Sequence, residues 1–146
     1  MAPMPEPTPP DPRPLEAALD RVGDRWSLLI VEALLDGSRR FGELGEVLPG
    51  IAPNILTDRL RRLERQGIVR STPYQQRPVR MSYALTADAR DLASALRLLA
   101  DWGARRTGGA DPIRHELCGT PLEARWFCPT CTVVVEDAQA TESRVL

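Results

Sequence analysis

One amphipathic helix, predicted over residues 53–66, constrains the fold of this chain more than any other feature. Its apolar face is formed by three leucines at helical spacing, Leu56, Leu60 and Leu63. A shorter helical pattern over residues 41–48 precedes it, and Pro49-Gly50 interrupts the chain between the two. Two short helices joined by such a tight turn are typical of a helix-turn-helix, so we expect a compact, mostly helical domain around them.

Apolar spacing elsewhere predicts a mainly α protein with a small β-hairpin, that is, an α+β fold. The segments are helices over residues 15–22 and 26–35, strands over residues 68–72 and 79–85, and a last long helix after the N-cap Thr86. Residues 73–78 contain two prolines and are expected to form the turn of the hairpin. A hairpin after the second helix of a helix-turn-helix is a wing, so the order predicts a winged helix-turn-helix.

The composition divides the 146 residues into four parts. Residues 1–14 contain seven prolines and predict a disordered tail, because such a segment cannot build a packed core. Residues 15–107 are predicted to form the winged helix-turn-helix domain, for DNA binding and dimerisation. Glycines and a proline mark a linker, after which residues 113–137 are expected to form a small zinc-ribbon-like module. Residues 138–146 are expected to form a second tail.

Positive charge is concentrated on the predicted second helix and wing, although the whole chain has a formal net charge of −1. Residues 52–80 hold seven Arg and two acidic residues, a local charge of +5. The helix face opposite the leucines is polar, as a helix in the major groove requires. The predicted DNA contacts are Arg40, Asn54, Thr57, Asp58, Arg59, Arg61, Arg62, Arg65, Arg77 and Arg80. An ordinary solvated helix face with a solvated turn is the alternative interpretation.

Several stretches of the sequence, in matching order and at matching spacing, resemble the HxlR-type regulators. They are LDRVGDRW at residues 19–26, RFGEL at 40–44, LPGI at 48–51, LTDRLRRLERQGIV at 56–69, RPVRMSYALT at 77–86, and WG at 102–103. The resemblance spans residues 13–106, and the stretch at 56–69 is the most specific. It implies a bacterial winged-helix transcriptional regulator related to the MarR type.

The resemblance also implies expectations for single residues. Members act as dimers in which the N-terminal and last helices form much of the interface, and the recognition role falls on Thr57, Arg59 and Arg61. Many members carry a cysteine where this chain has Arg13, so a thiol switch at that site is absent. Ala52 replaces the frequent serine before the recognition helix, which removes an N-cap worth about 1 kcal/mol.

The single His and all three Cys of the chain lie within 17 residues: His115, Cys118, Cys128 and Cys131. Each pair has two intervening residues, the spacing that lets two side chains of a tight turn face one ion. Three Cys and one His suit tetrahedral zinc, whereas rubredoxin-like iron needs four Cys. We therefore expect one structural Zn2+ per chain, in a module whose apolar cluster is formed by Trp126, Phe127 and residues 133–135.

Other interpretations of these four residues remain open. Cys128 and Cys131 could form a disulfide, although the cytoplasm disfavours one and a third Cys would be left over. A catalytic zinc normally keeps an open position, and four candidate ligands leave none. A water molecule or Glu116 could replace His115 as the fourth ligand. The zinc could also act as a metal or redox signal rather than as a structural element.

Three classes of function are compared. The first is a sequence-specific regulator that binds double-stranded DNA as a homodimer on a near-palindromic operator, with a possible but unidentified small-molecule effector. The second is a winged-helix module that binds proteins and not DNA; the basic residues over 52–80 favour the first class. An enzyme is not expected, because the only His belongs to the metal set and no phosphate-binding glycine loop exists. Without a signal peptide or a membrane-spanning segment, a cytoplasmic protein with no membrane partner is expected.

Overall fold

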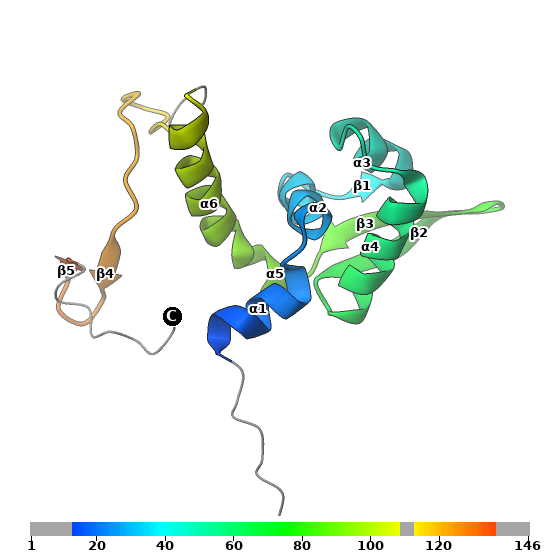
Figure 1. The fold of residues 1–146 in the computed structure, drawn as a ribbon, viewed down its shortest axis with the longest axis horizontal. Helices are drawn as coiled ribbons and strands as arrows, with labels where there is room; N and C mark the ends of the chain where they lie inside the picture. Colours follow the sequence, from blue (N-terminus) through cyan, green and yellow to red (C-terminus); the bar gives the residue numbers. More distant parts are fainter. Residues whose placement is uncertain (1–12, 109–112, 137–146) are drawn as a thin grey trace, which may run out of the picture.

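A computed structural model describes residues 13–108 and 113–136 of the chain (Figure 1). The predicted tails, apart from residues 13 and 14, therefore lie outside the described residues. The elements in chain order are α1 (Pro14–Val22), α2 (Arg25–Leu35), β1 (Arg39–Arg40), α3 (Phe41–Val47), α4 (Pro53–Arg65), β2 (Val69–Gln76), β3 (Val79–Leu85), α5 (Ala87–Arg90), α6 (Leu92–Thr107), β4 (Trp126–Cys128) and β5 (Val133–Val135). This α+β arrangement is a winged helix-turn-helix, which confirms that part of the predicted fold class.

The core lies between α2, α3 and α4 on one side and the β2–β3 hairpin on the other. The apolar side chains predicted for the inner helix faces are buried, and they include Ile30, Leu34, Leu44, Leu56, Leu60 and Leu63. Ile68, Val69 and Leu85 close this core from the hairpin. Burial of each such side chain stabilises the fold by about 1.5–3 kcal/mol, because its apolar surface is removed from water. The core therefore fixes α4 with its leucines inward and its opposite face outward.

The sheet is larger than the sequence predicts. Its three antiparallel strands lie in the order β1-β3-β2, and the two-residue strand β1 was not predicted, because two residues give no measurable periodicity. The prediction that residues 73–78 form the turn is wrong, since β2 continues to Gln76. Pro73 is tolerated because β2 is an edge strand, where a missing backbone N–H breaks no ladder, and the register shifts just after it.

The predicted last long helix is divided into α5 and α6 at Asp91. Thr86 caps it as expected, accepting a hydrogen bond of 3.3 Å from the backbone N–H of Ala89. Asp91 keeps helical angles, but its N–H bonds to the carbonyl of Asp88, three residues back, so this one turn is tightened. At the N-terminal end of the domain, the predicted tail is one residue too long. Pro14 is the first helical residue of α1, because proline suits the first position of a helix.

Helices α1 and α6 lie on one side of the winged helix, and α3, α4 and the β2–β3 hairpin lie on the other (Figure 1). The chain beyond α6 forms β4 and β5, an antiparallel pair that lies away from the core. Within residues 13–108 and 113–136, every helix is too short or too polar to cross a lipid bilayer.

Candidate nucleic-acid interface

The turn between α3 and α4 presents α4 at the surface. Leu48 and Ile51 anchor it to the core, and the N–H of Ile51 donates a 3.2 Å hydrogen bond to the carbonyl of Leu48. Gly50 has a φ of +88°, a conformation that glycine adopts at little cost. As expected from the sequence, Ala52 gives no side-chain cap, and Pro53 begins α4 instead.

The outward face of α4 carries polar side chains. Asn54, Arg61 and Arg65 are exposed, and Thr57 is half-buried with its hydroxyl donating to the carbonyl of Pro53 at 2.9 Å. Within the described part of the chain, no hydrogen bond or ion pair joins Arg61 to another protein group. Its guanidinium is therefore available to a ligand from outside, as direct contact with a guanine edge or a phosphate requires.

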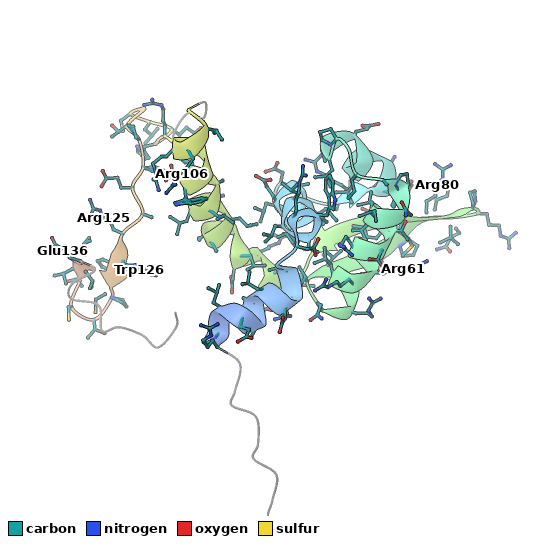
Figure 2. The ribbon with its side chains drawn as sticks, in the orientation of Figure 1. Arg61, Arg80, Arg106, Arg125, Trp126 and Glu136 are labelled. Atoms are coloured by element: carbon teal, nitrogen blue, oxygen red, sulfur yellow. The ribbon has the colours of Figure 1, made fainter. Side chains whose placement is uncertain are left out.

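The wing places further arginines beside this face. Arg77 and Arg80 are exposed at the end of the β2–β3 hairpin, and Figure 2 shows Arg80 and Arg61 on the side of the molecule away from α6. Arg40, at the start of α3, lies over the ring of Tyr74 on β2 at 4.5 Å from the ring centre. This contact joins the helix-turn-helix to the wing, although the guanidinium remains at the surface.

Three predicted DNA contacts are bonded to other groups of the protein. Arg59 donates to Asp24 at 3.0 Å and to Asp58 at 2.6 Å, and its side chain is only 26% exposed. Arg62 donates to the backbone carbonyl of Asp20 at 2.7 Å. The structure thus places Arg59 and Arg62 on the flank of α4 that packs toward α1 and α2, away from Arg61, whereas Asp58 stays exposed with its carboxylate paired to Arg59.

Asp24 is a residue that the sequence analysis missed. It caps α2 by accepting a 3.1 Å hydrogen bond from the backbone N–H of Ser27, and it receives Arg59 and Arg62 from α4. Burial opposes ionisation of Asp24, but the hydrogen bonds from Ser27 and the charge of Arg59 outweigh it, so the pKa of Asp24 lies below its ordinary value. An Asp three residues before a Ser, at the start of a helical pattern, was the available signal.

An apolar surface lies on α1 and α6, on the opposite side from the wing. Leu92 and Leu96 pack against the core, as the monomer requires. Five other side chains on these two helices stay about half exposed: Leu15, Leu19, Leu98, Leu99 and Trp102. We call this set the α1/α6 face. Several large apolar side chains left exposed on two helices in this way commonly mark a protein interface.

The four candidate metal ligands form two separate pairs. In the first, Nδ1 of His115 lies 3.2 Å from Sγ of Cys118; in the second, Cys128 is the last residue of β4 and Cys131 lies in the turn that leads to β5. Among residues 13–108 and 113–136, no three side chains of ligand type are gathered closely enough to hold one ion. The structure therefore forms both halves of the predicted set and does not join them.

Hydrogen bonds favour the thiolate form in both pairs. Hydrogen bonds with the side chain and the backbone of Thr120 hold the pKa of the Cys118 thiol below its ordinary value. Hydrogen bonds from Cys131 and from the backbone of Thr130 lower the pKa of Cys128. The expected apolar cluster is absent from this described segment: Trp126 is 70% exposed and Phe127 59% exposed.

A polar recognition helix beside a basic wing defines a winged helix-turn-helix transcriptional regulator. Residues 21–110 match the HxlR-like helix-turn-helix family, and the chain belongs to that family. The HTH-type transcriptional regulator Rv3095 of Mycobacterium tuberculosis is 40% identical over 118 residues, which cover 78% of this chain and 74% of that protein. YdeP of Bacillus subtilis, also an HTH-type regulator, is 36% identical over 100 residues, covering 68% of this chain and 78% of that protein.

Solved structures agree with this assignment. The reduced form of the redox regulator HypR, 34% identical, superposes with a TM-score of 0.61 and covers 64% of this chain and 93% of its own. The Pseudomonas aeruginosa protein PA1374, 35% identical, superposes with a TM-score of 0.67 and covers 88% of this chain and 89% of its own. The family and the curated relatives are transcriptional regulators, which confirms that the chain is a DNA-binding regulator and not an enzyme.

Proposed function

We propose that this regulator binds a specific, near-palindromic DNA sequence as a homodimer. In each protomer, α4 enters the major groove, and Asn54, Thr57 and Arg61 contact base edges. Arg65, Arg77 and Arg80 contact phosphates, and Arg40 supports the wing through Tyr74. The observation that carries the proposal is the exposed face of α4, whose Arg61 makes no hydrogen bond or ion pair with the described residues and lies on the same side as the wing.

The α1/α6 face supports the homodimer. Its five half-exposed apolar side chains lie on two helices on the side opposite the wing, so a second copy bound there would leave both α4 helices free. A two-fold dimer would place its recognition helices about one helical turn, ~10 base pairs, apart. The DNA that it regulates lies in the cytoplasm of a bacterial cell, so we propose that the protein acts there.

Selection from a random duplex library tests this function. The full chain is incubated with the library at low salt, and the retained duplexes are sequenced over several rounds. We expect enrichment of one near-palindrome with half-sites about 10 base pairs apart. Retention without any enriched sequence would contradict specific recognition, and no retention of any duplex would favour a protein-binding winged helix instead.

A further inference from the structure

The C-terminal segment contains two copies of one hairpin, thirteen positions apart. In the first copy, the N–H of Leu122 donates to the carbonyl of Ile113 at 2.7 Å, and Arg114 pairs with Pro121. In the second copy, Trp126 pairs with Val135 and Phe127 pairs with Val134. Each pairing of the first hairpin therefore recurs in the second, at residue numbers raised by thirteen.

The turns at the two hairpin tips also correspond. Gly119 has a φ of +70° and donates its N–H to the carbonyl of His115 at 2.8 Å. Thr132, thirteen residues later, has a φ of +56° and donates its N–H to the carbonyl of Cys128, also at 2.8 Å. The chain thus makes one and the same turn twice, although the sequences of the two turns differ.

Thr132 makes the second turn informative. It is the only residue other than glycine with a positive φ among the described residues, and its β-branched side chain disfavours that conformation by about 1–2 kcal/mol. A strained residue that persists in an exposed turn points to a requirement for the turn itself. In both turns, the residue with positive φ directly follows the second candidate ligand, Cys118 or Cys131.

We propose that these two turns are the two halves of one Zn2+ site, with His115 and Cys118 from the first hairpin and Cys128 and Cys131 from the second. Each turn holds two candidate ligands with two residues between them, which is half of a tetrahedral set. Three Cys and one His are ligands that zinc prefers, and four protein ligands leave no position for a substrate. The site is structural.

Binding the ion requires the two hairpins to close on each other, since the structure does not gather three ligands. Only residues 123–125 separate the paired segments, so the closure involves a short connector. The large apolar side chains of both hairpins are exposed, including Leu117 at 89% and Trp126 at 70%. Closure around zinc would cover part of this surface, and a metal can supply the folding energy that so small a segment lacks.

Metal content and cobalt substitution test the proposal on the full chain. Protein purified under reducing conditions without chelator is expected to hold one zinc per chain by elemental analysis. After chelation, Co2+ added alone should restore one equivalent, with thiolate charge-transfer bands and the visible bands of a tetrahedral site. Hydrogen exchange at the amides of the two turns should slow when the metal is added. Absence of both stoichiometric zinc and the cobalt bands would overturn the site, as would a Cys128–Cys131 disulfide in protein that was kept reduced.

Single substitutions identify the ligands. Cys128→Ser and His115→Ala should each lower cobalt affinity by at least tenfold, whereas Thr130→Ala, between Cys128 and Cys131, should not. Full affinity in His115→Ala would overturn the proposed fourth ligand, and equal losses in Thr130→Ala would show that the turn and not its thiols matters. DNA binding by the Cys128→Ser chain is measured in parallel. Because none of the four proposed ligands lies in the winged helix, we expect the Cys128→Ser chain to retain DNA binding. The experiment therefore tests the metal site and the DNA-binding function independently.

Discussion

Arg61 and Arg62 are adjacent in the sequence, yet α4 directs them into different surroundings. Arg61 is exposed on the outward face, with no bonded protein partner among the described residues. Arg62 is half-buried and ties α4 to the backbone of α1 through the carbonyl of Asp20, 2.7 Å away. One position is therefore available to DNA, whereas the neighbouring position stabilises the domain. This pair allows a matched test of binding against folding.

We expect Arg61→Ala to weaken binding to the selected duplex and to leave the free energy of unfolding nearly unchanged. The loss should be about 1–3 kcal/mol with relaxed preference at one position if the contact is to a base. If the contact is to a phosphate, the salt dependence should decrease by about one unit. Arg62→Ala, the control, should lower stability by ~1 kcal/mol through the lost hydrogen bond. Fluorescence anisotropy and urea denaturation measure the two effects, and the opposite pattern would contradict the assignment.

At the scale of elements, the turn between α3 and α4 depends on one backbone conformation. Gly50 has a φ of +88°, and a Cβ added there would meet no atom within 4 Å. Gly50→Ala should therefore lower stability by about 1–2 kcal/mol through backbone strain alone. Gly45→Ala, inside α3 and equally free of contacts, should raise stability by about 0.5–1 kcal/mol. Thermal denaturation compares the two variants, and a stable Gly50→Ala chain would show that the turn relaxes.

At the scale of the whole molecule, the α1/α6 face is expected to join two copies. Leu99→Glu places a charge within this face, where Leu99 is 52% exposed in the single chain, and should shift the protein from dimer to monomer. Arg97→Gln, an equal change in charge on the far side of α6, should leave the dimer intact. Light scattering at micromolar concentration reports the mass. A wild-type monomer would contradict the homodimer, as would a dimeric Leu99→Glu chain.

The sequence by itself determined which residues of α2, α3 and α4 form the core and where most helices begin. Leucine spacing placed Leu56, Leu60 and Leu63 on the inner face of α4, and local preferences placed Pro53 and Thr86 at helix starts. These features depend on residues that are close in the chain, so a linear pattern contains them. The resemblance of residues 13–106 to the HxlR-type regulators added the class of protein, which the family match confirms.

Only the tertiary structure decided which arginines of α4 are available to DNA. Arg59 and Arg62 were predicted DNA contacts, but Asp24, 35 residues before Arg59, binds one, and the backbone of α1 binds the other. Strand β1 likewise depends on pairing with β3, which lies far along the chain, and the extension of β2 past Pro73 depends on pairing with its hairpin partner β3. The equal spacing of the two C-terminal ligand pairs is visible in the sequence, but the shared positive φ is not, because Gly119 and Thr132 differ in residue type. Contacts between residues far apart in the chain set the partners of Arg59 and Arg62 and the pairing of β1, and local preference cannot specify them.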